Sequence, residues 1–301
     1  PALELFELVM VDEASQVDVA SAIGALAELA PNGRLVLLGD HLQMPPIAKI
    51  EPPKGCEHIV GSILDYFQVR FSEIEPQPLL ENYRSAEGLV RFARELGYPA
   101  KLSAKFPDSQ LALANALEQP MDWPDTLPWS PLFPALLNPA LSTLAVTYPD
   151  GKAGQANEFE ASLVVATVLL ARQSLLRGLS GRTESPTPGL DAQHFWTETV
   201  GIVTPHRAQR AAVIRGLRGA FPKEEGELIE KAVDTVERFQ GGERDLILVS
   251  FGVGDPDLIE AEEEFLLGLN RTNVAISRAR AKAIVFVSDD LSYHLPDDAA
   301  Q

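Results

Sequence analysis

Short apolar runs alternate with helix-like segments along almost the whole chain, and this alternation is the strongest constraint on its fold. Two apolar runs, residues 3–11 and 34–39, lie on either side of residues 17–29, where apolar side chains recur at helical spacing. The same order returns later, where residues 199–205 precede a helical segment and residues 269–288 read as a helix followed by a strand. Strands that alternate with helices favour a parallel β-sheet covered by helices. We therefore expect the α/β class.

Two prolines, Pro76 and Pro78, lie in an extended passage and indicate a boundary between two domains. We place the first domain at residues 1–76 and the second at residues 77–301. Within the second, residues 101–154 are rich in proline and aromatic residues and contain few periodic segments. We interpret them as an irregular insertion into the second domain.

The composition limits the classes of function. The chain of 301 residues has 43 acidic and 25 basic residues, and its net charge of −18 is unlike the basic footprint of a protein that coats nucleic acid. A narrow basic channel still fits this charge, because phosphate contacts act locally. Cys56 is the only cysteine, which excludes an intramolecular disulfide and favours a cytoplasmic location, including association with a nucleoid. The longest apolar stretch, residues 161–171, is too short to span a bilayer, so we expect no membrane partner.

Acidic residues follow two of the apolar runs directly. Asp12 and Glu13 end the first run, and Gly39 and Asp40 end the second. In parallel α/β sheets, ligands bind beyond the carboxyl ends of the strands, and a carboxylate there can hold Mg²⁺ directly or through water. A neighbouring carboxylate can orient or deprotonate a water molecule for attack on a phosphoryl group. Taken alone, such an acidic pair is more often a surface turn after a strand.

Four further motifs follow in order along the chain. They are GDHLQMPP at residues 39–46, NYRS at residues 82–85, FQGGERD at residues 239–245 and NVAISRAR at residues 273–280. Together with DEAS at residues 12–15, they resemble the motifs of superfamily 1 helicases, in the branch of the nonsense-mediated-decay RNA helicase and its DNA-unwinding relatives. Each motif is short, but five in the family's order are a specific signal. The resemblance implies RecA-like parallel sheets flanked by helices, with a partial first motor domain and a nearly complete second one.

The resemblance assigns roles to residues of the first two motifs. DEAS resembles a Walker B motif, which implies that Asp12 holds Mg²⁺ and that Glu13 activates the attacking water. GDHLQMPP implies that Gln43 senses the γ-phosphate of ATP and couples it to the nucleic-acid groove. Met44 departs mildly from the family, which usually has leucine or another apolar residue at this place. The cofactors implied by the resemblance are therefore ATP and Mg²⁺.

The later motifs supply the other groups that the resemblance implies around ATP. In NYRS, Tyr83 would stack on the adenine and Arg84 would reach the γ-phosphate. Glu243 in FQGGERD would contact the ribose, and Arg278 in NVAISRAR would act on the γ-phosphate as a second arginine. Ser277 replaces a threonine that the family more often has before this arginine, but it keeps the hydroxyl group.

Helical geometry gives a separate expectation for the two arginines near the end of the chain. If both lie on one helix, Arg278 shares a face with Arg271 and Val274, whereas Arg280 points about 200° away at about 100° per residue. Both side chains cannot then point into one cleft. We therefore expect Arg280 to be a structural salt-bridge partner and Arg278 to be the functional arginine.

The segment VTPHRAQ, residues 203–209, resembles more loosely a part of the second domain that contacts nucleic acid. At the ends of the second domain's strands we predict a track of basic and polar side chains for single-stranded DNA or RNA. Its residues are Thr204, His206, Arg207 and Thr235. For His206, a surface position at the start of a helix is an equally good interpretation. We also expect Thr204 to cap a helix that begins at Pro205.

Several other features fit structural roles better than chemical ones. An aromatic cluster in the insertion could stack on bases, but we prefer a small core of the insertion; its members are Trp123, Trp129 and Phe133. Asn157 and Glu160 match a pattern that recurs at this place in the family, and we expect a helix cap there. The resemblance does not cover residues 102–139 and 178–194, and the polar residues 179–193 are interpreted as a linker.

The 301 residues contain no G-x-x-x-x-G-K-[S/T] loop, whose backbone amides and lysine would hold the β- and γ-phosphates. DGKAGQ at residues 150–155 lacks the glycine spacing and the hydroxyl residue. We therefore expect the C-terminal part of an ATP-dependent helicase or translocase, without the N-terminal half of the same motor and inactive by itself. Two alternatives stay open: a degenerate nucleic-acid-binding module without catalysis, and a P-loop ATPase that remodels proteins.

Overall fold

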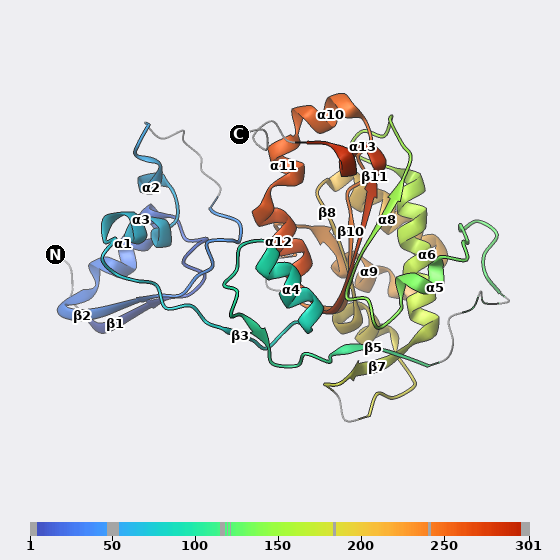
Figure 1. Ribbon diagram of the computed structural model, residues 1–301, viewed down its shortest axis with the longest axis horizontal. Helices are drawn as coiled ribbons and strands as arrows, with labels where there is room; N and C mark the ends of the chain where they lie inside the picture. The colour runs from blue at the N-terminus through green and yellow to red at the C-terminus, as the bar shows by residue number, and fades with distance from the viewer. Residues whose placement is uncertain are drawn as a thin grey trace. The chain divides into compact units, whose positions relative to one another are not determined.

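The computed structural model describes residues 5–46, 54–114, 118, 120, 122–182, 185–239 and 242–295. The chain divides into two compact units, Pro1–Pro78 and Leu79–Gln301. Each unit contains a parallel sheet with helices packed against it, as Figure 1 shows. The predicted α/β class with parallel sheets flanked by helices is confirmed.

The first unit is built on two parallel strands with a helix between them. β1 (Phe6–Val11) and β2 (Leu29–Leu37) pair in parallel and α1 (Val19–Ala27) connects them, so the carboxyl ends of both strands meet at one edge. Two shorter helices, α2 (Glu57–Val60) and α3 (Ile63–Arg70), follow in the chain. Apolar side chains of α1, α3 and the inner face of β1 form a small core around Ala14, Ala22 and Ile63.

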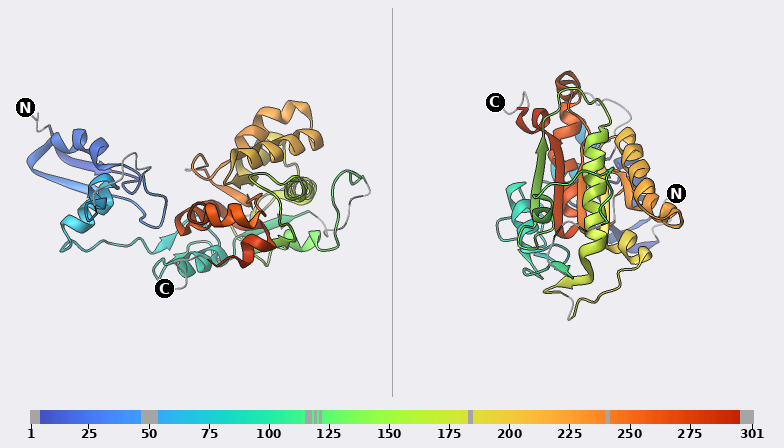
Figure 2. Two further views of the ribbon diagram at one scale, coloured as in Figure 1. Left: turned by 90° about the horizontal axis from the view of Figure 1, so that it is seen from above. Right: turned by 90° about the vertical axis from the view of Figure 1, so that its right-hand side faces the viewer.

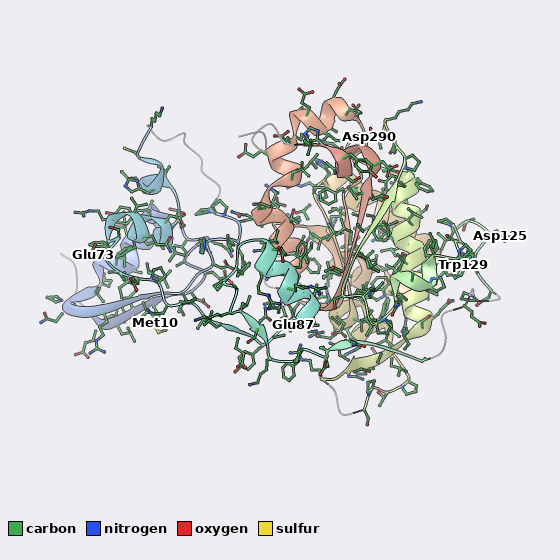
Figure 3. All side chains as sticks on the ribbon, in the orientation of Figure 1. Met10, Glu73, Glu87, Asp125, Trp129 and Asp290 are labelled. Atoms are coloured by element: carbon green, nitrogen blue, oxygen red, sulfur yellow. The ribbon has the colours of Figure 1, made fainter. Side chains whose placement is uncertain are left out.

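The other face of this small sheet exposes large apolar side chains. Phe6, Leu8 and Met10 alternate along β1, and each is 50 to 59% exposed. Figure 3 shows the side chain of Met10 on the side of the sheet away from α1 and α3. Alternate residues of a strand point to opposite faces, so Val9 and Val11 face the core instead. The sheet of the first unit therefore has one covered face and one exposed apolar face.

The second unit contains a five-stranded parallel sheet in the order β6-β11-β10-β8-β9. The strands are β6 (Thr143–Tyr148), β8 (Val200–Thr204), β9 (Val233–Thr235), β10 (Arg244–Ser250) and β11 (Ala279–Ser288). All five residues of β8 and all but the first of β10 are buried, as expected for a parallel sheet covered on both faces. The central strands therefore carry the longest runs of valine, isoleucine and leucine.

Helices cover both faces of the five-stranded sheet. α6 (Glu158–Ser174), α8 (Arg207–Ala220) and α9 (Gly226–Ala232) lie on one face, and α4 (Glu87–Glu95) and α12 (Leu269–Ser277) lie on the other (Figure 1 and Figure 2). The middle of α6 is buried on every side, because α8 packs against it while it rests on the sheet. This packing forms the main core of the second unit.

Two short strand pairs extend the second unit beyond its central sheet. β3 (Glu81–Asn82) pairs in parallel with β4 (Ser103–Ala104), and β5 (Gln110–Leu113) pairs antiparallel with β7 (Leu175–Ser180). Residues 101–154, interpreted as an irregular insertion, thus contribute β4 and β5 and also β6, an edge strand of the central sheet. The interpretation of residues 179–193 as a linker is wrong at both ends, because Leu179 and Ser180 belong to β7 and Ala192 and Gln193 belong to a short helix, α7 (Ala192–His194). Gly178 interrupts the apolar pattern of β7, so the sequence did not indicate a strand there.

Two local predictions in the second unit are also corrected. Helix α8 begins at Arg207 with His206 as its N-cap residue, so Thr204 does not cap it. The hydroxyl of Thr204 instead donates to the carbonyl of His206 at 3.1 Å. The predicted aromatic cluster of the insertion is not a separate core, because Phe133 belongs to the main core and Trp129 stacks on it with centroids 5.6 Å apart.

Short helical segments complete the second unit. They are α5 (Phe133–Leu136), α7 (Ala192–His194), the π-helical turn η1 (Phe195–Thr199), the 3₁₀ turn η2 (Lys223–Glu225), α10 (Pro256–Ala261), α11 (Glu263–Leu267) and α13 (Asp289–Tyr293). The side chains of Phe195 and Trp196 in η1 are fully buried in the main core. Among the residues that the structure describes, no helix has the length and apolar character needed to cross a bilayer.

Candidate functional site

The carboxyl ends of β1 and β2 bring two of the predicted motifs together in the first unit. Asp12 and Glu13 follow β1 and are exposed, and Asp40 follows β2. The amide of Ala14 donates to the carbonyl of Leu38 at 2.8 Å and ties the two strand ends. The acidic residues of both motifs therefore lie at the same edge of the small sheet, as the parallel arrangement requires.

Glycine is required where these two loops approach each other. A Cβ atom at Gly39 would lie 2.8 Å from the amide nitrogen of Ser15, closer than two such atoms can pack. The carboxylate of Asp40, the next residue, accepts two hydrogen bonds. Oδ1 accepts from the amide of Leu42 at 3.0 Å, and Oδ2 accepts from Nε2 of Gln43 at 2.9 Å. The side chain of Gln43 is thereby fixed beside the strand ends.

Glu13 has an unusual backbone conformation. Its φ is 51°, in the left-handed region that residues other than glycine rarely adopt. Its amide donates to Oδ1 of Asp12 at 2.9 Å, and its Oε2 accepts from Nε2 of Gln16 at 2.8 Å. Strained residues of this kind concentrate at functional sites. The turn presents two exposed carboxylates directly beyond β1.

The donors at this edge fit Mg²⁺. This ion takes one or two carboxylates from a protein and otherwise binds water and substrate phosphate oxygens. The exposed carboxylate of Asp12 can serve as such a ligand, and that of Glu13 can hold a water molecule beside it. In the described parts of the chain, no group of three or more His, Cys, Asp or Glu side chains is placed to hold a metal ion.

The second unit gathers three other predicted residues around one open pocket. Tyr83, Arg84 and Glu243 line a hollow of about 460 Å³, together with Asn82 and Arg182. Two residues of the FQGGERD motif, 240 and 241, lie outside the described residues. The pocket therefore joins the NYRS motif to the glutamate of FQGGERD, although more than 150 residues separate them.

Arg84 and Glu243 form an ion pair in this pocket. Nε of Arg84 donates to Oε2 of Glu243 at 2.9 Å, and Nη1 donates to the carbonyl of Ser277 at 3.2 Å. Burial alone would raise the pKa of Glu243, but the hydrogen bond and charge of Arg84, helped by Arg280 and Arg182, hold it below its usual range. Glu243 is therefore ionised at neutral pH and orients the guanidinium group of Arg84.

The NYRS segment is also fastened to the start of β11. The side chain of Asn82 accepts from the amides of Arg84 and Ser85, both at 2.8 Å. Oγ of Ser85 then donates to the carbonyl of Ala279 at 3.0 Å, and a backbone hydrogen bond of 2.9 Å joins Ala86 to Arg280. The NYRS and SRAR motifs are thus neighbours through their backbones.

The ring of Tyr83 is exposed but held at its edge and on one face. It is 60% exposed, and Nζ of Lys105 lies 5.4 Å from its centroid. Lys105 also contacts Glu81 at 3.2 Å, and a hydrogen bond from the hydroxyl of Tyr83 to Glu81 raises the pKa of the tyrosine. An oriented, exposed aromatic ring of this kind suits stacking with a flat heterocycle.

The helical argument about Arg278 and Arg280 rests on a wrong premise. Helix α12 ends at Ser277, so Arg278 is its C-cap residue and Arg280 lies in β11. The conclusion about Arg280 is nevertheless confirmed, because its guanidinium contacts Asp245 at 2.7 Å, Glu198 at 3.2 Å and Glu243 at 3.3 Å.

The structure gives Arg278 a buried side chain. It is 3% exposed, and its carbonyl accepts from the amide of Arg244 at 3.0 Å. Its backbone therefore lies beside the NYRS pocket, at the junction of α12 and β11, while the described surface of the pocket is formed by other residues. The predicted role of Arg278 at a phosphate stays a prediction.

The comparisons with known proteins agree with the order of these motifs. The family model described as an AAA domain matches residues 62–290, which is most of the chain. The chain belongs to this family. Its curated relatives are helicases of the group that the five motifs resemble, so the assignment to superfamily 1 is confirmed.

Three relatives illustrate the range of the family. The DNA replication ATP-dependent helicase/nuclease JHS1 of Arabidopsis thaliana is 28% identical over 97% of this chain and 19% of its own length. The corresponding protein dna2 of Schizosaccharomyces pombe is 27% identical over 94% of the chain and 18% of its length. The putative helicase MOV-10 of Gallus gallus is 26% identical over 93% of the chain and 29% of its length. The chain thus spans less than a third of the length of each of these three relatives.

Among solved structures, the PRRSV helicase is similar at a coarse level. It has a TM-score of 0.41 and 14% sequence identity, and the match covers 95% of this chain and 35% of the viral chain.

The structure only partly assembles the predicted nucleic-acid track. Thr204 and Thr235 are paired across the ends of β8 and β9, but both are buried. His206 is also buried: its ring lies 5.3 Å from that of Phe265, and its Nε2 lies 3.0 Å from a carboxylate oxygen of Glu262. Burial lowers the pKa of His206 although Glu262 opposes this effect. Of the four predicted residues, Arg207 alone is exposed.

The predicted helix cap at Asn157 is confirmed, but its partner Glu160 does more than the sequence indicates. Oδ1 of Asn157 accepts from the amide of Glu160 at 3.0 Å. The carboxylate of Glu160 is fully buried and accepts from Oγ of Ser250 at 2.5 Å, from the amide of Gly252 at 2.9 Å and from the hydroxyl of Tyr148. Burial outweighs these donors and raises its pKa to about 7.

Arg182 was missed by sequence reasoning. It lies in the polar stretch interpreted as a linker and outside the resemblance to the helicases. Its side chain donates to backbone carbonyls, which residues of every type carry. The sequence therefore does not identify its partners. The local cue in the sequence is Gly181 just before it, because a glycine often marks a tight turn. In the structure Gly181 has a positive φ, as such a turn requires.

Proposed function

We propose that this chain is part of an ATP-dependent helicase or translocase that moves along single-stranded DNA or RNA. The observation that carries the proposal is the pocket of Tyr83, Arg84 and Glu243. An exposed aromatic ring stands beside a guanidinium group that a carboxylate orients, and these are the groups that a nucleoside triphosphate needs for its base, phosphate and sugar. Membership of the helicase family supports the same reading.

In this proposal the groups of the second unit bind and orient ATP. Tyr83 stacks on the adenine, Glu243 contacts the ribose and Arg84 donates to γ-phosphate oxygens. Before nucleotide binds, the hydrogen bond to Glu243 orients the guanidinium of Arg84. When ATP binds, Arg84 would replace this hydrogen bond by one to the γ-phosphate, or would make both. We assign Arg278 to the γ-phosphate as a second arginine on the strength of its motif.

The groups of the first unit supply the chemistry of hydrolysis. Glu13 holds the attacking water and takes up its proton, and Gln43, fixed by Asp40, senses the γ-phosphate. Asp12 would hold Mg²⁺, which would neutralise charge on the phosphates when bound. We propose that the first unit is the C-terminal part of one motor domain and that the second unit is the other motor domain.

Nucleic-acid-stimulated ATPase activity of the whole protein tests the proposal. Wild-type protein is compared with Glu13→Gln and Arg84→Ala, and with Arg91→Ala, an exposed arginine of α4, as the control. We expect Glu13→Gln to lower turnover by roughly 10²- to 10⁴-fold, as loss of a general base does, while ATP still binds. Full activity in both site variants would refute the assignment.

The same assay separates the proposal from its alternatives. A degenerate binding module would bind single strands without turnover in the wild type, and a protein-remodelling ATPase would hydrolyse ATP without stimulation by nucleic acid. Single-stranded DNA and RNA should both be tried. Several relatives are named as DNA replication helicases, and MOV-10 is named only as a putative helicase. We propose a cytoplasmic location on the basis of the single cysteine.

A further inference from the structure

The β5–β7 ribbon ends at the pocket of Tyr83 and Arg84. Leu179 and Ser180, the last residues of β7, pair antiparallel with residues 111 and 110 of β5. The next residue, Gly181, has a φ of 75°, and a Cβ atom there would lie 2.4 Å from the carbonyl oxygen of Asp108. Only glycine fits this turn, which brings the chain against the backbone before β5. The ribbon therefore sets the position of the following residue, Arg182.

Arg182 donates to two successive carbonyl groups of the NYRS motif. Its Nη1 donates to the carbonyl of Arg84 at 2.8 Å, and its Nη2 donates to that of Tyr83 at 2.9 Å. Cζ of its guanidinium lies over the ring of Phe106, 4.7 Å from the ring centroid. A planar group with diverging N–H donors can hold two acceptors at once while it stacks, which a lysine cannot do.

The two held peptides carry the two side chains that the proposed function assigns to the base and the γ-phosphate. On the other side of the segment, Asn82 holds the amides of Arg84 and Ser85. With Arg182 on the carbonyls and Asn82 on the amides, the backbone of Tyr83 and Arg84 is held from both sides. Neither contact touches the ring of Tyr83 or the guanidinium of Arg84.

We propose that Arg182 is a positioning residue of the nucleotide pocket, which fixes the backbone of Tyr83 and Arg84 so that both side chains meet ATP in one geometry. The inference rests on the proposed function and adds to it a residue outside the recognised motifs. It also assigns a structural role to the β5–β7 ribbon, because the ribbon positions this side chain at the pocket.

The test is ATPase kinetics of the whole protein with Arg182→Ala and Arg182→Lys, and with Arg91→Ala as the control. We expect Arg182→Ala to raise the KM for ATP by about tenfold and to change kcat less, because the groups that bind ATP remain but are no longer held. Arg182→Lys, which can serve one carbonyl at a time, should lie between alanine and wild type. A residue with a merely structural role would lower the amount of active protein and leave KM unchanged.

A double-mutant cycle with Tyr83→Ala shows whether Arg182 acts through Tyr83. If it does, the rise in KM in the double variant is smaller than the product of the two single effects. Multiplicative effects, or a KM for Arg182→Ala within about twofold of wild type, would overturn the inference and leave the proposed function intact. A wild-type protein without ATPase activity would overturn both. If Arg182→Ala does not fold, Arg182→Lys decides the question. A KM of Arg182→Lys equal to that of wild type would contradict the need for a planar group that donates to two carbonyls at once.

Discussion

Arg280 holds three carboxylates together and should matter for stability more than for catalysis. It contacts Glu198, Glu243 and Asp245 within 3.3 Å, and its side chain is 16% exposed. Burial raises the pKa of Asp245 to about 6 even though Arg280 opposes this effect. Removing one partner of a buried ion pair leaves charge without compensation, so we expect Arg280→Ala to lower the free energy of unfolding by about 3 kcal/mol. Urea denaturation, with Arg91→Ala as the control, measures this loss.

Arg278 should show the opposite pattern, with hydrolysis lost and ATP binding nearly kept. Arginines that act on a transferring γ-phosphate contribute about 10³- to 10⁵-fold in rate, and we expect Arg278→Ala to lower kcat steeply. Because its side chain is buried, the unfolding curve must be measured beside the kinetics. Turnover within a few-fold of wild type, or a loss explained entirely by unfolding, would refute the role.

Glu160 makes stability depend on pH near neutrality. Burial raises the pKa of its carboxyl group from 4.5 to about 7, so the folded protein favours the protonated form. Stability that this group contributes is fully present below about pH 4.5 and is lost as pH rises from there to about 7, with a limiting slope of about 1.4 kcal/mol per pH unit. We expect the free energy of unfolding to fall more steeply between about pH 5 and 7 in wild type than in Glu160→Gln. Equal slopes would show that Glu160 does not titrate in this range.

At the scale of elements, we propose that the exposed start of α8 contacts nucleic acid. Arg207 is the first residue of this helix and lies just beyond the carboxyl end of β8, while Thr204 and His206 before it are buried. We expect Arg207→Glu to weaken binding of single strands and to lower the salt slope of the binding constant by about 0.7, the contribution of one phosphate contact. Fluorescence titrations at several salt concentrations measure the slope. Arg91→Glu, on the opposite face of the sheet, is the matched control and should change neither quantity as much.

The order of strands and helices could be predicted from the sequence because it depends on apolar periodicity, which is local. The runs at β8 and β11 fill buried strands, the runs at β1 and β2 fill strands with one covered face, and each is recognisable without knowing its neighbours. The end of α12 at Ser277 could not be predicted, because no glycine or proline marks it and the strand pairing of β11 decides where the helix stops.

Residues of the candidate site could be predicted from the sequence only where they belong to a recognisable motif. Arg84 and Glu243 were found from their motifs and do pair, at 2.9 Å. Burial depends on packing between distant segments, so the sequence could not show that His206 is enclosed by Phe265 and Glu262. Arg182 could not be found because it binds backbone atoms, which every residue type offers.

At the scale of the whole molecule, the proposed function gives the two units complementary parts of one reaction. The first unit has the acidic residues Asp12 and Glu13, and the second has the tyrosine and arginine to which we assign nucleotide binding. A glycine-rich phosphate loop, which gathers several backbone donors and a lysine around the β- and γ-phosphates, is absent from the 301 residues. The chain also has a net charge of −18, which repels a triphosphate.

We therefore expect the 301-residue chain by itself to bind ATP weakly and to show no ATP hydrolysis stimulated by nucleic acid at millimolar Mg²⁺. Phe6, Leu8 and Met10 expose an apolar sheet face in the first unit, so the isolated chain should also be prone to association. Titration of labelled ATP into the chain, followed by phosphate release with and without single-stranded DNA or RNA, measures both quantities. If the gene encodes a longer product with a phosphate loop, that product is the positive control and should hydrolyse ATP. Micromolar affinity or measurable turnover from the 301 residues alone would show that the pocket of Tyr83 and Arg84 binds ATP without such a loop.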